Sequence, residues 1–557
     1  MFDQNKGLYV AHCEAGPLSI CGRMANRHGL IAGATGTGKT VSLQVIAETF
    51  SQAGVPCFMA DMKGDLSGIS QTGSMSGFIQ KRCAEFGIEN PKFAGCPVRF
   101  FDVYGEQGHP MRTTVSNMGP QLLARLLQLN EVQEGVLNVL FRVADERGLL
   151  LIDIKDFRAM LGYVSEHAAE ISRQYGAVSA TSVAAIQRSL LALENQGADK
   201  FFGEPSFDIF DLMQCEGGKG VMSVLAADRL MLNPKLYSTF LLWLLSDLYV
   251  QLPEVGDLDL PKLVFFFDEA HTLFDGTSKA LIDKIEQVIR LIRSKGVGIY
   301  FITQSPTDIP EDILGQLGNR VQHALRAYTP KDQKAVRAAA ETFRVNPAFD
   351  TEEAIMQLET GEALVSFLDG KGAPSVVQRA RMLFPLSQIG AISSGQRTQL
   401  INASRLYGRY DHPIDRESAF EVLLAESEKV AAELKEQQEA EAQEKANIEA
   451  EKAEAAERKL AEKERKAAEK EQKAAEKREK ADAKKSGSGL AKKIATAAVG
   501  AAISSVSRSV GTSVSNSITG KKSKSTSAKS VAGKAASSAA SSVVRNLTRS
   551  ILGNLLK

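Results

Sequence analysis

Residues 33–40 constrain the fold of this chain more than any other segment. They read Gly-Ala-Thr-Gly-Thr-Gly-Lys-Thr and match a complete phosphate-binding pattern, GxxxxGK followed by Ser or Thr. The run follows an apolar segment, Leu30–Ala32, and precedes a stretch that favours a helix from Val41 to about Ser51. Glycines let successive backbone N–H groups face phosphate oxygens, and the helix adds its positive N-terminal end. The sequence therefore predicts a strand–loop–helix unit that binds a nucleoside triphosphate.

The positions within this loop have separate predicted roles. Lys39 is expected to reach the β- and γ-phosphates, and the Thr40 hydroxyl is expected to ligate Mg²⁺. ATP and Mg²⁺ are therefore the expected ligands. The backbone cradle for the phosphates is expected to be Gly33, Ala34, Thr35, Gly36, Thr37 and Gly38.

A second apolar run, residues 263–267, is followed by the carboxylates of Asp268 and Glu269. A buried strand would hold Asp268 beside the triphosphate, where its carboxylate can bind Mg²⁺ through water. Glu269 would then polarise the attacking water. Downstream of a phosphate-binding loop, this acidic pair predicts a hydrolytic site. His271 fits capping or packing as well as it fits a catalytic role.

Two more apolar runs end in polar side chains. Gln304 follows residues 299–303, and its amide is expected to contact the γ-phosphate or the attacking water; capping of the next loop is the alternative. Asp61 ends residues 57–61 and is expected at the same sheet edge. It would either orient the water ligands of the metal or cap the following turn.

Two arginines are candidates for a charge contributed by a neighbouring subunit. A guanidinium supplied in this way stabilises the transferring phosphoryl group. Arg293 precedes the strand that ends at Gln304, and Arg320 begins the strand after it. For each of them, a surface salt bridge is the alternative interpretation.

Residues 30–400 alternate apolar runs with amphipathic stretches, which is typical of an α/β fold with a doubly wound, mostly parallel sheet. Residues 1–29 form a short strand-like region before this core, and residues 121–213 have a helical pattern that we interpret as an insertion. The expected strands are 30–32, 57–61, 98–102, 220–225, 263–268, 299–303, 321–326 and 363–368.

The C-terminal part divides into a charged segment and a basic one. Residues 420–485 are rich in Ala, Glu and Lys, and they nearly lack the large apolar residues of a coiled-coil seam. We therefore expect a solvated single helix of roughly 100 Å rather than a coiled coil. Residues 486–557 hold 11 Lys and Arg and no Asp or Glu. Their last stretch, 543–556, has helical spacing and could dock on the body, a neighbouring subunit or a membrane surface; an unstructured basic tail is the alternative.

The longest apolar stretch, residues 236–252, contains Asp247 and is shorter than a typical membrane span, so we expect a buried helix. The six cysteines have no metal-binding spacing, and the N-terminus has no signal-like pattern. These features lead us to expect a cytoplasmic protein with reduced thiols.

The motifs, in this order, resemble the HerA–FtsK superfamily of hexameric P-loop motor ATPases, and within it the short HerA-like bacterial proteins of the YjgR type. The resemblance covers about residues 20–390. It implies a RecA-like core in a homo-hexameric ring, ATP bound between subunits and translocation on DNA. It also favours Arg293 over Arg320 as the arginine that acts on a neighbour. The matching segments are 28–40, 61–68, 202–205, 268–271 and 303–306.

One departure concerns the segment before the phosphate-binding loop. HerA itself has a β-barrel there, whereas 32 residues cannot form a full barrel, which puts in doubt a nuclease partner docked through one. We expect an ATP-hydrolysing, HerA-like DNA translocase or helicase. The alternative is an ATPase that remodels protein or membrane complexes without nucleic acid. A scaffold without turnover is disfavoured by the intact Glu269.

Overall fold

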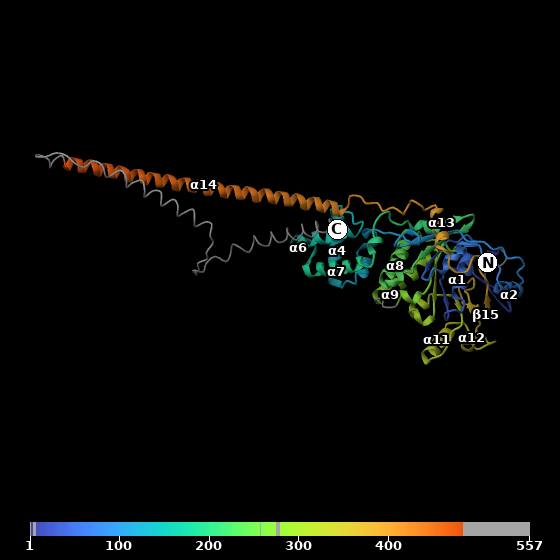
Figure 1. The fold of residues 1–557 in the computed structure, drawn as a ribbon. Helices are drawn as coiled ribbons and strands as arrows, with labels where there is room; N and C mark the ends of the chain where they lie inside the picture. Colours follow the sequence, from blue (N-terminus) through green and yellow to red (C-terminus); the bar gives the residue numbers. More distant parts are fainter. Residues whose placement is uncertain (1, 4–6, 257, 275–278, 483–557) are drawn as a thin grey trace. The chain divides into compact units, whose positions relative to one another are not determined.

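The computed structural model describes residues 2–3, 7–256, 258–274 and 279–482 (Figure 1). The chain divides after Leu424 into two compact units. The first holds the sheet and the helices around it, and the second contains most of one long helix, α14 (Ala419–Asp482). The basic tail expected at 486–557, with its helix at 543–556, lies outside the described residues.

Among the described residues, one sheet of 13 strands organises the first unit (Figure 1). Its order is β1-β2-β15-β14-β13-β4-β12-β11-β5-β10-β6-β7, with β3 paired to β2. All pairs from β13 to β7 in this order are parallel, whereas the pairs from β1 to β13 are antiparallel. The predicted α/β fold with a mostly parallel sheet is confirmed. The strands of the parallel part are β4 (Gly29–Ala32), β5 (Cys57–Asp61), β6 (Val98–Asp102), β7 (His109–Pro110), β10 (Met222–Ala226), β11 (Leu263–Phe267), β12 (Val297–Thr303) and β13 (Asn319–Gln322).

Helices cover both faces of this sheet, which explains why its central strands are apolar throughout. In β11, Phe266 packs against Phe50 of α1 on one face, and Phe265 and Phe267 share a core with α8 and α9 on the other. Helix α8 is the buried helix expected around residues 236–252. These helices are α1 (Lys39–Gln52), α8 (Pro234–Gln251) and α9 (Lys279–Ile292).

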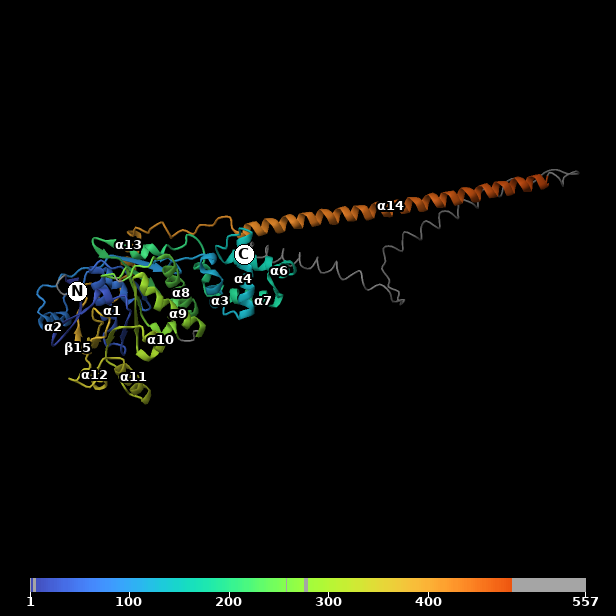
Figure 2. The ribbon, with the colours of Figure 1, turned by 180° about the vertical axis from the view of Figure 1, so that it is seen from behind.

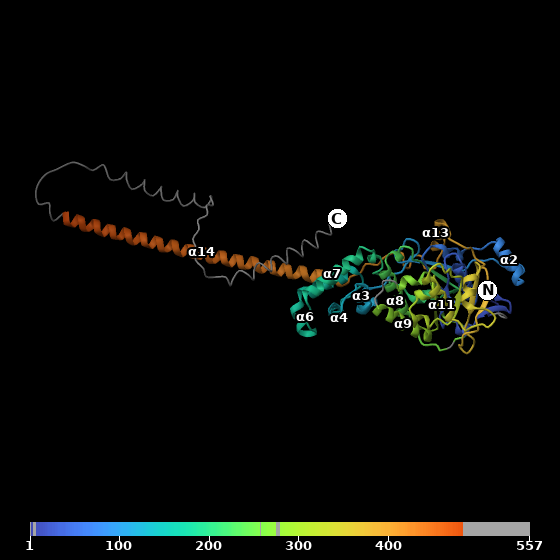
Figure 3. The same ribbon diagram turned by 90° about the horizontal axis from the view of Figure 1, so that it is seen from below.

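The predicted helical insertion is present between β7 and the hairpin β8 (Cys215–Glu216) and β9 (Lys219–Gly220). Its helices α4, α6 and α7 lie at the opposite end of the first unit from α2 (Gly77–Phe86) in all three views (Figures 1, 2 and 3). Within the described part of the chain, no single helix is long and apolar enough to cross a membrane, although the bent pair α6–α7 passes that test. The helices of the insertion are α3 (Val115–Leu126), α4 (Glu131–Glu146), α5 (Ile154–Glu166), α6 (Ala168–Tyr175) and α7 (Ala180–Glu194).

The N-terminal strands extend the sheet of the core. They join it through β15 (Gln378–Met382), a strand that the sequence analysis missed. Its sequence, Gln-Arg-Ala-Arg-Met, places the buried Ala380 and Met382 on one face and charged residues on the other. The other antiparallel strands are β1 (Phe2–Asp3), β2 (Gly7–Cys13), β3 (Gly16–Ile20) and β14 (Glu362–Ser366). The remaining helices are α10 (Glu311–Leu314), α11 (Pro330–Glu341), α12 (Thr351–Gln357) and α13 (Ser394–Asn402).

The long charged helix predicted after the core is confirmed as α14, which has 64 residues. Its described side chains are exposed from Glu428 onward. Ion pairs four residues apart, such as Glu462 with Lys466 at 2.6 Å, lie along its surface.

Candidate active site

Four adjacent strands bring the predicted site residues to one edge of the sheet. The strands β4, β12, β11 and β5 are parallel neighbours, so their carboxyl ends meet. In the register of these pairs, Ala32 lies opposite Thr303, and Phe267 lies opposite both Phe301 and Ala60. The residues that follow these strand ends are Gly33, Gln304, Asp268 and, at the end of β5 itself, Asp61.

The phosphate-binding loop is fixed by its neighbours. Gly33 has φ +152°, and a Cβ there would lie 2.5 Å from the Cβ of His323. The Ala34 N–H donates to the carbonyl of Ala324 at 2.8 Å, and the Gly361 N–H donates to the carbonyl of Thr37 at 2.9 Å. Helix α1 then begins at Lys39, with its N-terminus directed to the loop. The N–H groups of Gly33 and Ala34 thus donate within the protein, to Thr303 and Ala324, which corrects their predicted place in the phosphate cradle; the rest of the loop can receive phosphate oxygens.

Lys39 lies over this loop. Its ammonium group donates to the carbonyl oxygens of Gly33 at 2.7 Å and Ala34 at 3.1 Å. Burial lowers the pKa of Lys39, and the nearby charges of Glu269 and Asp268 oppose this shift. The lysine is therefore on the same side of the loop as the acidic residues of the predicted hydrolytic site.

His323 connects α1 to strands β13 and β14. Its Nδ1 atom lies 2.8 Å from the Glu362 carbonyl, and its Nε2 atom lies 2.8 Å from the Ser42 hydroxyl oxygen. A neutral ring satisfies both contacts when Nδ1–H donates and Nε2 accepts. Burial lowers the pKa of His323 to about 4. The sequence analysis gave this residue no role.

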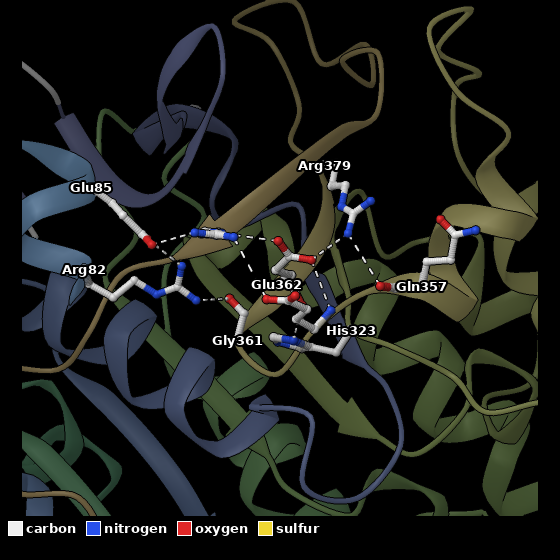
Figure 4. A network of polar contacts seen from close by, with 9 residues as sticks. Arg82, Glu85, His323, Gln357, Gly361, Glu362 and Arg379 are labelled. Carbon is white, nitrogen blue, oxygen red and sulfur yellow. Dashed lines mark hydrogen bonds and ion pairs between the residues drawn. The ribbon is translucent and has the colours of Figure 1, made fainter. Parts of the chain in front are cut away.

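An ionic network lies behind the loop, around Glu362 (Figure 4). The Glu362 carboxylate accepts from Arg379 at 2.8 Å and from Arg381 at 3.2 Å. Arg82 donates to the carbonyl of Gly361 at 3.2 Å, next to the contact that Gly361 makes with the loop. Burial by itself would raise the pKa of Glu362, but the arginines outweigh it and the pKa is lowered. The network therefore stabilises the strand end that supports the loop.

Asp268 has the features expected of a metal-binding carboxylate. It is 4% exposed, and its Oδ2 atom has no hydrogen-bond partner among the described residues. Burial, and after it the neighbouring Glu269, raises the pKa of Asp268 to about 6. A buried oxygen without a partner is costly unless a ligand contacts it, and Mg²⁺ prefers oxygen ligands. Asp268 therefore fits the predicted magnesium site, and the role of Thr40, the second residue of α1, stays a prediction.

Glu269 is held by contacts on both carboxylate oxygens. Lys63 donates to Oε1 at 2.5 Å, and the Gln304 amide donates to Oε2 at 3.4 Å. His271 Nδ1 lies 3.5 Å from the same Oε2. Burial by itself would raise the pKa of Glu269, but Lys63 outweighs it and the pKa is lowered. The structure thus brings Glu269, Gln304 and Lys63 together, whereas the predicted contact of Gln304 with the γ-phosphate or the attacking water stays a prediction.

Lys63 is the main residue of this edge that the sequence analysis missed. It stands between two acids in the run Asp61-Met-Lys-Gly-Asp65, directly after a buried strand. A lysine between two acidic residues at the end of a buried strand could have indicated that Lys63 belongs to the active site. Its partner Glu269 is 206 positions away in the sequence, so the contact itself could not be predicted.

Asp61 caps the turn after β5. Its Oδ1 accepts from the Gly64 N–H at 2.8 Å, and its Oδ2 accepts from the Leu66 N–H at 3.2 Å. Burial, and after it the neighbouring Asp65, raises the pKa of Asp61 to about 7. These contacts support the interpretation of Asp61 as a cap of the turn, and its role at the metal stays a prediction.

The two candidate arginines differ in their availability. Arg320 donates to three carbonyls of its own chain, those of Leu314, Leu317 and Thr342. Its guanidinium is therefore engaged within its own chain, and these bonds disfavour the predicted contact with a neighbouring subunit. Arg293 is exposed at the turn η7 (Arg293–Lys295), and its side chain has no hydrogen bond or ion pair with any residue that the structure describes. Its role stays a prediction.

Sequence comparisons identify relatives of this chain. Two curated relatives are named DNA double-strand break repair helicase HerA: one from Sulfurisphaera tokodaii, 33% identical over 109 residues, and one from Sulfolobus acidocaldarius, 30% identical over 99 residues. These matches cover 19% and 18% of this chain, and 21% and 19% of the relatives, so the chain matches about a fifth of their length.

Solved structures of similar fold include the bacterial conjugative coupling protein TrwB, at 14% identity and a TM-score of 0.48, covering 70% of this chain and 91% of that chain. VirB4 of Thermoanaerobacter pseudethanolicus has 14% identity and a TM-score of 0.43, with 71% and 99% covered. The family described as Helicase HerA-like C-terminal matches residues 8–508. This chain, with its P-loop and acidic strand end, therefore belongs to the family described as Helicase HerA-like C-terminal.

Proposed function

We propose that this protein is an ATP-hydrolysing motor that moves along DNA or moves DNA. The observation that carries the proposal is the meeting of the phosphate-binding loop, the unpartnered oxygen of Asp268 and the carboxylate of Glu269 at one sheet edge. Phosphoryl transfer needs positioned charges of this kind and little covalent chemistry from the protein. The fold and the family membership support the same class of activity.

The residues at this edge of the sheet have separate proposed roles in ATP hydrolysis. The loop N–H groups and Lys39 bind and orient the phosphates, and Thr40 with Asp268 would hold Mg²⁺. When bound, Mg²⁺ neutralises charge on the phosphate oxygens. Glu269 accepts a proton from the attacking water, and Gln304, which contacts Glu269, orients that water. An arginine of a neighbouring subunit, Arg293, stabilises the transferring phosphoryl group, which requires a ring such as a homo-hexamer.

DNA is proposed as the substrate because the curated relatives carry DNA helicase names and the family is HerA-like. Binding would be directed to the phosphates and would not depend on base sequence, so it should weaken as salt increases. A nuclease or other protein partner belongs to the same proposal, with no residue assigned to it.

Steady-state ATP hydrolysis of the full chain tests this proposal. It is measured with and without single- and double-stranded DNA, for the wild type and Glu269→Gln. We expect a several-fold stimulation by DNA that falls with salt and disappears in Glu269→Gln. A rate that depends on Glu269 but not on DNA would contradict the DNA assignment and favour remodelling of protein or membrane complexes.

A further inference from the structure

Lys63 is a charged residue of the active site that the proposed mechanism does not use. It lies in the turn between β5 and the short helix η2 (Asp65–Ser70). Its side chain is 51% exposed, whereas that of its partner Glu269 is 9% exposed. The contact therefore joins a side chain that is accessible to solvent to a buried carboxylate.

The backbone that carries Lys63 is held by several hydrogen bonds, whereas its side chain makes one within the described part of the chain. The Asp61 carboxylate accepts from the N–H groups of Gly64 and Leu66, and the Ser67 hydroxyl donates to the Gly64 carbonyl at 2.9 Å. These bonds anchor the turn on both sides of Lys63. The long side chain, with Glu269 as its only hydrogen-bonded partner among the described residues, can leave that partner without any movement of the turn.

Glu269 is held in an unusual conformation. Its backbone has φ +47° and ψ +47°, in the left-handed region that residues other than glycine rarely adopt. Such a conformation persists when surrounding contacts hold it. Here the Glu269 carbonyl accepts from the N–H and the hydroxyl of Thr272, each at 2.9 Å, and the carboxylate is contacted by Lys63 on Oε1 and by Gln304 on Oε2. A carboxylate that must accept a proton from water is thus engaged on both oxygens.

We propose that Lys63 is a positioning residue that restrains Glu269, so that hydrolysis is slow until the stimulating substrate separates the two side chains. This inference rests on the proposed function and adds a means of regulation to it. It requires no change of sheet or loop, because the rotation of one exposed side chain frees Oε1. The same ammonium could instead act directly on the triphosphate, and the two roles predict opposite effects when Lys63 is removed.

Kinetics of Lys63→Met separate these roles. As a restraint, Lys63 predicts that Lys63→Met raises the basal kcat about fivefold or more. The KM for ATP should stay unchanged, and stimulation by DNA should fall correspondingly. Lys63→Arg, which keeps the charge, should behave like the wild type. Lys92→Met, at an exposed lysine outside the site, is the matched control.

A fall in kcat in Lys63→Met would overturn the inference and make Lys63 a phosphate-contacting group. An unchanged basal kcat, with an unchanged thermal midpoint, would also overturn it. Wild-type protein without Glu269-dependent hydrolysis would overturn the proposed function together with this inference. Glu269-dependent hydrolysis that Lys63→Met does not accelerate overturns the inference alone.

The chemical reactivity of Lys63 gives a readout that does not depend on turnover. Acetylation by a soluble anhydride, followed by mass spectrometry, reports whether the amine is paired. We expect Lys63 to react several-fold faster in Glu269→Gln than in the wild type, and Lys92 to react equally in both. Equal reactivity of Lys63 in the two proteins would show that the ion pair does not restrain it and would overturn the inference.

Discussion

The charged residues of the active-site edge and those of helix α14 have opposite surroundings. Asp268 and Glu269 are 4% and 7% exposed, and Glu269 pairs with Lys63, whose own side chain is 51% exposed. Glu462 and Lys466 on α14 form an ion pair of 2.6 Å, close to the 2.5 Å between Lys63 and Glu269. Their side chains, however, are 62% and 70% exposed. Solvent screens exposed pairs, which contribute less than about 1 kcal/mol each. Ion pairs of similar length therefore position a catalytic carboxylate at the active-site edge, whereas on α14 they lie on the surface of a long solvated helix.

Under the proposed mechanism, the largest effects should follow from Glu269 and Arg293, which would act on the same phosphate from different subunits. Glu269→Gln and Arg293→Ala should each lower turnover about 10³-fold, because one removes the general base and the other a transition-state charge. If Arg293 acts on a neighbour, mixing the two inactive proteins should restore activity. Turnover by the mixture is the measurement, and Lys466→Ala on α14 is the control that should leave the rate unchanged.

The second prediction concerns the buried histidines of the first unit. The described part of α14 has no histidine, so this effect of pH should arise in the first unit. His28 donates from Nε2 to the Ile289 carbonyl and accepts the Ile299 N–H at Nδ1, and burial lowers its pKa to about 4. The unfolded chain takes up this proton near pH 6.5, so stability is complete above pH 6.5 and is lost as pH falls toward 4. His323 behaves in the same way. Each shift corresponds to about 3 kcal/mol.

Urea unfolding between pH 7 and pH 4 checks this prediction. His323→Asn should flatten the dependence of the unfolding free energy on pH, relative to the wild type. His412→Asn, at an exposed histidine, should leave that dependence unchanged. Identical slopes for all three proteins would mean that the buried ring does not resist protonation.

The third prediction uses the contrast between the two arginines. Arg320→Met leaves three backbone carbonyls without their donor and should lower the unfolding free energy by about 2–3 kcal/mol. Arg293→Ala should change it by less than about 0.5 kcal/mol, because its side chain is exposed. Denaturant midpoints of both variants measure this. A stable Arg320→Met protein with low turnover would contradict this prediction and would favour Arg320 as the arginine that acts on the phosphate.

The smallest effect is expected on α14. Glu462→Ala removes an exposed pair and should cost less than about 0.5 kcal/mol of local helix stability, with no change in ATP hydrolysis. Hydrogen exchange of the amides around residue 462 measures the first quantity. A loss of hydrolysis in this variant would contradict the division between the two regions.

The sequence predicted the parts of the structure that depend on local pattern. The strand limits of β5 and β6 match the prediction because each is a mainly apolar run that ends in an aspartate, with Arg99 as the one charged residue inside β6. Strand β15 was missed because two arginines interrupt its apolar pattern. Contacts between distant segments could not be predicted: His323 meets Ser42 across 281 positions, and only the folded sheet brings them together.

The role of Arg320 shows the same limit. Its place at the start of a strand was compatible with a contact to a neighbouring subunit. The carbonyls that occupy its guanidinium come from a preceding turn and from Thr342, 22 positions later. Residue type and spacing therefore indicated the chemistry of this edge, and the folded structure determined which side chains are available for it.

The affinity for ATP with and without Mg²⁺, measured by equilibrium titration of the wild type and Asp268→Asn, tests the central claim most directly. If the buried oxygen of Asp268 completes a magnesium site, Mg²⁺ should tighten ATP binding to the wild type by about tenfold or more, and Asp268→Asn should lose most of that gain. An equal effect of Mg²⁺ on both proteins would contradict the assignment of Asp268 to the magnesium ion of bound ATP.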